Sequence, residues 1–263
     1  MLISFKTSKK TKETDMNENR EKNVLNLLEK RQYASVEEVS RALDVSDSTT
    51  RRIFEGLQSK GLITRTHGGA KINDANNAAP SFTFRIHQNL FEKKKIALSA
   101  IKLIKNGDII FLDGSTTAYC IAEYLGEFEN IKVITNGIET LSLLSQNKIP
   151  AYSTGGVVSS ENPSVLVGGY AEDGVNNFFA DIVFFSARAL EKDGRIYDCY
   201  EEEIFIRRAM IKHAKTKVFL CDETKFGRTS PHLLCSLADV DYVASNQPLP
   251  DYVPGDKALS LFD

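Results

Sequence analysis

The chain has 263 residues, of which 42% are hydrophobic and 26% are charged, and its formal net charge is −2. This length and apolar content suit a small domain followed by a larger one and exclude a disordered chain. Residues 1–73 hold 14 basic and 10 acidic side chains, whereas the rest of the chain holds 19 basic and 25 acidic ones. Only the N-terminal part therefore suits a polyanionic partner.

Cysteine spacing and hydropathy exclude several further classes. The four cysteines are scattered without metal-ligand spacing, so we expect reduced thiols, no metal site and no cofactor. No stretch approaches the roughly 20 apolar residues of a membrane span. Residues 1–17 carry lysines but no apolar signal-peptide core, and we expect them to form a disordered basic tail. These features predict a cytoplasmic protein that contacts no membrane.

Residues 18–72 have the pattern of a DNA-binding module. Glu18–Arg31 places Val24, Leu25 and Leu28 on one face, as a supporting helix does. Two short helices follow within Ser35–Gly61, each with one apolar stripe, and Asp44–Ser46 joins them tightly. Ser46 or Asp47 can cap the second helix, which is expected to end at Lys60–Gly61. The pattern predicts a helix-turn-helix.

Polar and cationic side chains mark the face that would meet DNA. After the second helix, Leu62–His67 alternates and ends at Gly68–Gly69, as the wing of a winged helix does. Short hydroxyls and guanidiniums suit phosphates and base edges in a major groove. The predicted DNA-binding residues are Ser46, Ser48, Thr49, Thr50, Arg51, Arg52, Arg65 and His67.

The same residues carry a family resemblance. Thr50–Arg52, followed by Leu57, Gly61–Leu62, Arg65 and His67–Ala70, resembles the N-terminal signature of DeoR-family transcriptional repressors. That family usually has an acidic residue and leucine directly after the paired arginines, whereas this chain has Ile53–Phe54. The resemblance implies binding to double-stranded operator DNA.

A change of pattern separates the module from the rest. Asn73–Pro80 is polar and aperiodic, and we assign residues 73–92 to a linker. Within it, the alternation of Phe82, Phe84 and Ile86 predicts that Ser81–Phe91 forms an edge strand.

Residues 93–263 repeat one theme, a short apolar run followed by a small or polar loop and a helical pattern. The predicted strands are Ile109–Leu112, Lys132–Thr135, Ala151–Thr154, Asp181–Phe185 and Lys217–Cys221. The predicted helices are Lys93–Lys105, one after Asp113–Thr117 through Leu125, one after Asn136–Gly137 through Leu144, and Glu201–Met210. This alternation predicts an α/β domain with a mostly parallel sheet, which makes the whole chain α/β in class.

Loops at the carboxyl ends of parallel strands share one edge, where ligands bind. Gly114, Ser115, Thr116 and Thr117 form a turn with hydroxyls that suits a phosphate, although such residues also serve as helix caps. Thr135–Gly137 and Thr154–Gly156 repeat the geometry. Lys225 could meet a phosphate or remain a solvated lysine, and carboxylates could accept hydrogen bonds from sugar hydroxyls. The predicted effector-binding residues are Asp113, Gly114, Ser115, Thr116, Thr117, Thr135, Asn136, Gly155, Gly156, Arg188, Glu201, Asp222 and Lys225.

The order of these motifs extends the resemblance. DGSTT, TNG, TGG, the helix from Glu201 and DETKFG follow the order of the DeoR-family effector domain. The resemblance implies a fold similar to ribose-5-phosphate isomerase and an effector that is a phosphorylated sugar. Ser186–Ala189 departs from the glycine-containing loop of the family, and Arg188 adds a side chain at the site edge.

Two functions follow from these patterns. The first is a repressor of a sugar-metabolism operon, released by a sugar phosphate and acting as a homodimer or homotetramer on paired half-sites. The choice between repressor and activator stays open. The alternative is a sugar-phosphate isomerase or deaminase with a DNA-binding arm, using Asp113, Glu201 and Lys225. The chain lacks the Lys-Gly-Gly-Gly run of those isomerases and has no histidine on these loops, so we expect a non-enzyme without catalytic residues.

Overall fold

The computed structural model describes residues 20–72, except positions 22, 26, 29, 30, 32, 60 and 61, and residues 82–259. The chain divides into two units, the first ending at Gln88 and the second beginning at Asn89. The predicted tail, residues 1–17, and residues 73–81 of the predicted linker lie outside the described residues. Within the described part, no helix is both long and apolar enough to span a membrane.

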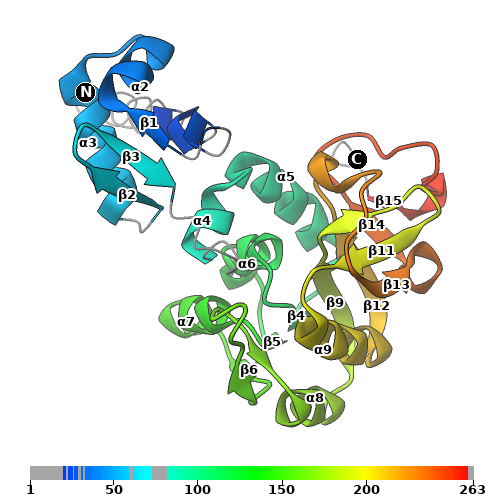
Figure 1. Cartoon of the computed structure of the whole chain (residues 1–263). Coiled ribbons are helices and arrows are strands. Elements are labelled where there is room, and N and C mark those ends of the chain that lie inside the picture. The colour runs from blue at the N-terminus through cyan, green and yellow to red at the C-terminus, as the bar shows by residue number, and fades with distance from the viewer. Residues whose placement is uncertain are drawn as a thin grey trace, which may run out of the picture. The chain divides into compact units, whose positions relative to one another are not determined.

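The first unit is a winged helix-turn-helix (Figure 1). Helical residues within positions 20–31 precede β1 (Tyr33–Ser35), α2 (Val36–Leu43) and α3 (Asp47–Ser59), and β2 (Ile63–Thr66) and β3 (Gly69–Ile72) form the wing. The antiparallel sheet has the order β1-β3-β2. Ser35 caps α2 in a capping box with Glu38. The predicted helix-turn-helix and wing are therefore confirmed.

One apolar core holds these elements together. Its buried residues come from the first helix, α2, α3 and the wing, and they include Leu28, Val39, Phe54, Leu57 and Ile63. Such residues lie on one stripe of each helix and on the inner side of the sheet. The opposite face of α3 is therefore left to solvent.

The predicted edge strand at Ser81–Phe91 is wrong. The structure has α4 (Phe82–His87) there, and α5 (Leu90–Ala100) begins three residues later. The backbone N–H and C=O groups of a strand need a neighbouring strand as hydrogen-bond partner, whereas those of a helix bond within the helix. Asn89, with φ of +52°, separates the two helices in the left-handed conformation.

The second unit contains a seven-stranded sheet in which all neighbouring strands are parallel (Figure 1). The order is β15-β14-β12-β9-β4-β5-β6. The strands are β4 (Ile109–Leu112), β5 (Lys132–Thr135), β6 (Ala151–Ser153), β9 (Ala180–Ser186), β12 (Ala214–Leu220), β14 (Tyr242–Ala244) and β15 (Ala258–Leu259). The predicted parallel sheet is confirmed, and β4 and β5 have the predicted bounds.

Helices connect these strands in two groups. α5, followed by the short helix Ile101–Leu103, packs beside α6 (Thr116–Ala122), which packs beside α7 (Ile138–Gln146). α8 (Gly169–Asn176) packs against α9 (Glu201–Lys212). The chain adds β5 and β6 in one direction along the sheet and returns to β9 and β12 in the other. Right-handed crossovers then place the two groups on opposite faces.

Several smaller elements were not predicted, including β14 and β15 of the parallel sheet. β7 (Val157–Val158) and β8 (Leu166–Val167) form a short hairpin, and α8 follows it. β10 (Ala189–Leu190), β11 (Arg195–Asp198) and β13 (His232–Ser236) form an antiparallel sheet. Strands of two or three residues are too short to leave a periodic signal in sequence, which accounts for β7, β8, β10, β14 and β15.

Buried aromatic rings fill the centre of the second unit. Phe185 and Phe219, on the neighbouring strands β9 and β12, pack with ring centroids 5.4 Å apart. The four cysteines are free, and burial raises the pKa of each thiol to about 12. They therefore remain protonated thiols at neutral pH, in keeping with the predicted reduced state.

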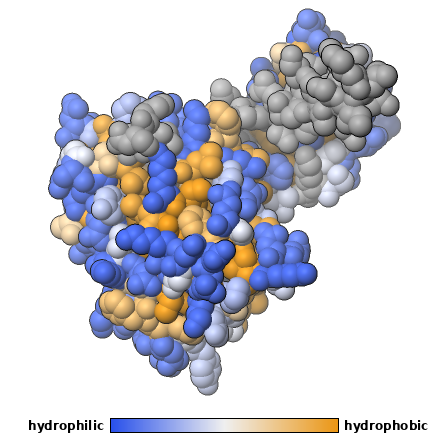
Figure 2. Space-filling view, turned by 180° about the vertical axis from the view of Figure 1, so that it is seen from behind, coloured by the Kyte–Doolittle hydropathy of each residue, from blue (hydrophilic) through white to orange (hydrophobic). Residues whose placement is uncertain are grey.

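The surface of the second unit is not uniformly polar. Figure 2 shows an apolar patch in the middle of one face, bordered by hydrophilic side chains. Large apolar side chains that remain exposed in this unit are Phe91, Leu98, Tyr152, Val157, Val158, Tyr170, Phe179, Phe205 and Leu233. Exposed apolar surface of this kind is typical of protein contacts.

Candidate functional site

The N-terminus of α3 presents a cluster of hydroxyls. Ser46 Oγ accepts a hydrogen bond from the Thr49 backbone N–H at 3.2 Å, which is the predicted cap. Ser46 Oγ also lies 2.9 Å from both Ser48 Oγ and Thr49 Oγ1. Ser46 and Ser48 are exposed, so these hydroxyls can contact a polyanion.

Thr50 is the exception among the predicted DNA-binding residues. Its side chain is fully buried, and its hydroxyl lies 3.0 Å from Ser40 Oγ of α2. The position falls on the same helical stripe as Ile53, Phe54 and Leu57, which face the core. Thr50 therefore joins the two helices and cannot reach DNA.

The predicted DNA-binding residues that carry cationic or imidazole side chains lie on α3 and on the wing. Arg51 and Arg52 are exposed, as is His67 at the wing turn. Arg65 of β2 is also exposed, and its Nη1 donates to Oε1 of Glu55 on α3 at 3.0 Å. This ion pair joins the exposed face of α3 to the wing.

In the second unit, the predicted effector loops follow neighbouring strands at one sheet edge. Going along the sheet, they follow β12, β9, β4, β5 and β6. Thr154 N donates to Thr135 O at 3.1 Å, and a Cβ on Gly137 would lie 3.1 Å from Gly114 Cα. The loops are thus in contact with one another, as the sequence predicts.

Asp113 lies beneath this edge and not on its surface. The residue is fully buried. Its Oδ1 accepts from Ser115 N at 3.1 Å, and its Oδ2 accepts from Ser186 N at 3.0 Å and from Arg207 Nε at 2.8 Å. The predicted contact between Asp113 and a sugar hydroxyl does not fit this burial. Its carboxylate instead fixes the loops after β4 and β9.

Arg207 of α9 joins three buried carboxylates. Besides Asp113, its Nη1 donates to Asp198 Oδ2 at 2.9 Å and its Nη2 donates to Glu203 Oε2 at 2.6 Å. Burial opposes the charge, but the attraction of the three carboxylates outweighs it and raises the pKa of Arg207 above its ordinary value. The guanidinium therefore stays charged and ties α9 to two loops.

The cluster extends to the hairpin segment between β7 and β8. Asn162 Nδ2 donates to Glu203 Oε1 at 2.6 Å, and Ser159 Oγ donates to Glu202 Oε2 at 3.2 Å. At the start of β8, Leu166 N donates to Asn136 O of the loop after β5 at 2.8 Å. Sequence reasoning did not assign Arg207, Asp198, Glu203 or Asn162 to the site. The spacing of Glu203 and Arg207 in sequence is typical of an exposed helical ion pair.

The loop after β4 is closely packed at its glycine. A Cβ on Gly114 would lie 2.2 Å from Val165 Cγ1 of the hairpin segment and 3.5 Å from Asn136 Oδ1. That oxygen is buried and has no hydrogen-bond partner among the described residues. Ser115 caps α6 by accepting from Ala118 N, and Thr116 and Thr117 follow almost buried. Thr135 is fully buried, and its hydroxyl accepts from Gly137 N.

Replacing Gly114 by alanine should destabilise the second unit by about 1–3 kcal/mol, because the new methyl group would overlap Val165. The free energy of unfolding from urea titrations measures this change. Gly126→Ala is the matched control, since a Cβ on Gly126 would meet no atom within 4 Å. Equal stability of the two variants would show that the loop can accommodate a methyl group at Gly114, contrary to the close contact with Val165.

The loop after β6 uses two glycines in the left-handed region. Gly155 has φ of +73° and Gly156 has φ of +102°, a conformation that side chains rarely adopt. A Cβ on Gly156 would also lie 2.5 Å from Val167 O. Both glycines are exposed, so their backbone remains accessible at the edge.

Lys225 and Asp222 occupy the loop after β12. Lys225 Nζ donates to Ser186 Oγ at 2.7 Å and lies 3.5 Å from Asp222 Oδ2. Ser186 Oγ in turn donates to Leu220 O at 2.7 Å. The Lys225 ammonium is thereby fixed beside the loop after β9, with Asp222 as its counter-ion.

Asp222 should contribute a stability that depends on pH. Burial opposes ionisation of its carboxyl group, but Lys225 and two hydrogen bonds from Thr224 outweigh it and lower the pKa below 3.8. Because the pKa of Asp222 is lower in the folded state than in the unfolded state, its ionised carboxylate stabilises the fold fully at a pH above the unfolded-state pKa. This stabilisation is lost as the pH falls through the folded-state pKa. Asp222→Asn should therefore lower the urea midpoint at pH 7, and its difference from the wild type should shrink below pH 3.8. A difference that is constant with pH would contradict this assignment.

Arg188 and Glu201 lie at the border of the edge. Both side chains are exposed, Arg188 in the turn before β10 and Glu201 at the start of α9. The Arg188 backbone N–H donates to Tyr197 O at 3.0 Å, which fixes the turn but leaves the guanidinium at the surface. Within the described residues, no group of three or more histidine, cysteine, aspartate or glutamate side chains is arranged to hold a metal ion.

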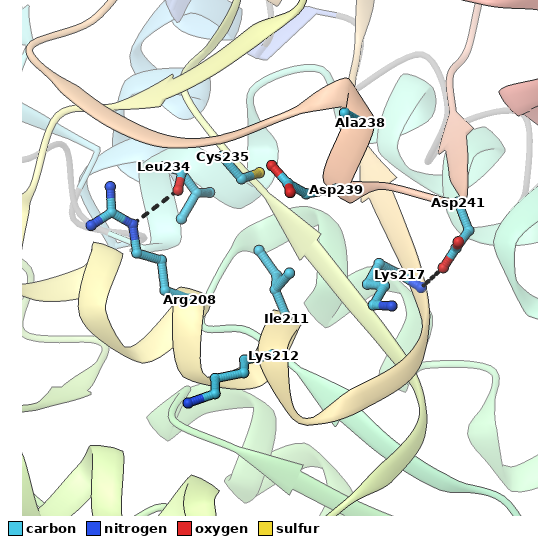
Figure 3. Close-up of a pocket in the computed structure, with 9 residues that line it drawn as sticks. All are labelled: Arg208, Ile211, Lys212, Lys217, Leu234, Cys235, Ala238, Asp239 and Asp241. Carbon is cyan, nitrogen blue, oxygen red and sulfur yellow. Dashed lines mark hydrogen bonds between the residues drawn. The ribbon is translucent and has the colours of Figure 1, made fainter.

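A cavity of about 570 Å³ lies elsewhere in the second unit, between α9, β12 and β13 (Figure 3). Asp241, which directly precedes β14, also lines the cavity, and its Oδ2 accepts a hydrogen bond from Lys217 N of β12 at 2.8 Å. The cavity is therefore toward the amino ends of the strands, away from the effector loops. Figure 3 shows Arg208, Lys212 and Lys217 pointing in different directions, so they offer no common anion position.

The fold and these surfaces define a helix-turn-helix transcriptional regulator with a separate sensor domain. Two family models match the chain, the DeoR-like helix-turn-helix domain over residues 20–76 and the DeoR C-terminal sensor domain over residues 88–247. The chain belongs to the DeoR family of transcriptional regulators. It is therefore a regulator and not an enzyme.

Two relatives are similar to this chain along most of their length, and a solved structure is similar along about half. The HTH-type transcriptional regulator GolR of Listeria innocua is 33% identical over 86% of this chain and 89% of its own. The L-fucose operon activator of Haemophilus influenzae is 30% identical over 88% of this chain and 93% of its own. The solved structure of ribose 5-phosphate isomerase A from Methanocaldococcus jannaschii is 23% identical, covers 53% of this chain and 55% of its own, and has a TM-score of 0.41.

Proposed function

We propose that this regulator represses a sugar-metabolism operon and releases its operator when a phosphorylated sugar binds at the sheet edge. The observation that carries the proposal is the contact among the loops after β12, β9, β4, β5 and β6. They bring a fixed ammonium, exposed glycine backbone and threonine hydroxyls to one edge. Those groups match a phosphate and a polyol better than an apolar ligand.

Roles follow from position at the sheet edge and from hydrogen bonding. We assign the phosphate to Lys225, Ser115 and Thr116, and the rest of the ligand to the exposed glycines of the loop after β6. The unpartnered Oδ1 of Asn136 is the acceptor that we assign to a sugar hydroxyl. Asp113 acts as a positioning residue, since all its contacts hold the loops in place. Arg188 lies at the border of the edge, where its exposed guanidinium would contact the ligand.

The DNA surface calls for a symmetric oligomer. Recognition helices of this type read two half-sites about one helical turn apart, which a homodimer or homotetramer supplies. The apolar surface of the second unit offers the place where copies would meet (Figure 2). Ligand binding would then change the relative placement of two DNA-binding units. A protein with this role acts on DNA in the cytoplasm.

One gel-shift experiment tests both DNA binding and its response to the sugar phosphate. A gel-shift with the region upstream of the protein's own gene should show a sequence-selective complex without sugar phosphate and loss of that complex with it. Absence of any selective complex under both conditions would contradict the proposal. A complex that forms only with the sugar phosphate would show that the ligand promotes DNA binding, which contradicts release by the ligand.

The ligand class has its own test. Melting temperatures measured with ribose 5-phosphate, glucose 6-phosphate, fructose 1-phosphate and glucosamine 6-phosphate should rise for at least one compound, because a ligand that binds only the folded state stabilises it. The corresponding unphosphorylated sugars are the controls. Equal shifts with and without the phosphate, or shifts that persist in Lys225→Met, would argue against a phosphate site at Lys225.

A further inference from the structure

Glu55 is an acidic side chain in the middle of the surface that should meet DNA. It lies on the exposed face of α3, four residues after Arg51 and three after Arg52. Its side chain is 63% exposed, and its recorded contact is with Arg65 of the wing at 3.0 Å. A carboxylate at this place repels phosphates and lowers the affinity for any DNA unless it finds a hydrogen-bond donor.

The ion pair also reduces the contribution of Arg65 to the affinity for DNA. While Nη1 of Arg65 is held by Glu55, the two charges cancel. Both groups are well exposed, so the pair is weakly held and can separate. If Arg65 moves to a phosphate, Glu55 is left without its partner. A bare carboxylate in a major groove has a partner where cytosine presents its N4 amino group.

From this geometry we propose that Glu55 is a specificity-determining residue. It allows Arg65 to bind a DNA phosphate only where a C·G base pair lies beneath α3. On random DNA, Arg65 stays with Glu55 and adds little affinity. On the operator, cytosine N4 donates to Glu55, and Arg65 is free to bind a phosphate. This inference rests on the proposed DNA-binding role of α3 and the wing, but not on the effector site.

A double-mutant cycle tests the coupling between the two residues. Dissociation constants are measured for a random-sequence 30-base-pair duplex at several salt concentrations, using wild type, Glu55→Gln, Arg65→Gln and the double variant. Glu55→Gln should bind roughly three- to tenfold more tightly, with a salt slope steeper by about 0.9, since Arg65 now neutralises a phosphate. Arg65→Gln should change binding less than twofold in the wild type and about three- to tenfold in the Glu55→Gln background.

The matched control is Glu37→Gln on α2. Glu37 is also an exposed carboxylate in an ion pair, 2.7 Å from Arg41, and it lies outside α3. It should change random-duplex binding by less than twofold. All these variants should melt within a few degrees of the wild type, because exposed ion pairs contribute little to stability.

Selection of binding sites from random duplexes then tests the base preference. Wild-type protein should recover a motif with a C·G pair at one position in each half-site, and Glu55→Gln should lose the preference at that position alone. The proposal is overturned if Glu55→Gln behaves like Glu37→Gln on random DNA, or if it keeps the C·G preference. In either case a selective wild-type motif would still support the proposed regulator, whereas no motif with the wild type would contradict that function itself.

Discussion

Replacing Arg207 by methionine should lower the free energy of unfolding of the second unit by about 3–5 kcal/mol, because it leaves three buried carboxylates without their cation. Arg207, Asp113, Asp198 and Glu203 are all at most 6% exposed. Methionine keeps much of the side-chain volume, so the loss comes from charge and hydrogen bonds and not from a cavity. Arg207→Lys should recover only part of it, since an ammonium cannot reproduce three directed bonds.

Hydrogen exchange in urea measures this change in β9 and β12 separately from the first unit. Arg195→Gln is the control, because Arg195 pairs with Asp193 at the surface. It should leave the exchange midpoints unchanged. A stable Arg207→Met protein with exchange like that of Arg195→Gln would mean that the cluster does not organise the sheet edge.

Substitutions in the two units should separate binding to DNA from binding to the effector. Arg51→Ala or Arg52→Ala should weaken operator binding by about 1–3 kcal/mol each, roughly 5- to 150-fold, if each forms a bidentate contact with a base. Melting-temperature shifts caused by the sugar phosphate should stay as in the wild type. Thr116→Ala and Lys225→Met should have the opposite pattern, with operator binding intact and the ligand-induced shift lost.

Fluorescence anisotropy with a labelled operator and thermal denaturation give the two readouts on the same preparations. Thr50→Val serves as a reference for structural damage, because Thr50 is buried against Ser40 and has no route to DNA. If Thr116→Ala keeps the full response to sugar phosphate, the phosphate does not bind at the loop after β4. If Arg51→Ala keeps operator affinity, α3 does not read the groove through that residue.

Local periodicity was enough to predict most elements of the fold. Apolar stripes gave the helices of the first unit, and apolar runs before small loops gave β4 and β5 with their bounds. Parallel topology then placed the loops at one edge without any coordinates. The error at Phe82–His87 has the same origin, since a six-residue alternation cannot show whether a strand partner exists.

The predictions for individual site residues depended on burial, which sequence shows poorly. Thr50 stands beside two exposed arginines but belongs to the apolar stripe of α3. Asp113 has the residue type of a sugar ligand, yet its partner Arg207 is 94 residues away in sequence. A contact between such distant positions leaves no local pattern. The hairpin that holds Val165 over Gly114 was missed because its two-residue strands leave no periodic signal.

The dissociation constant of the operator complex, measured with and without the sugar phosphate that raises the melting temperature, tests most directly whether the two units are coupled. We predict weaker binding by about 1–3 kcal/mol, roughly 5- to 150-fold, when the sugar phosphate is present. Lys225→Met should remove this difference. An operator affinity that is the same at saturating sugar phosphate would contradict the account, because the bound ligand would then have no effect on DNA.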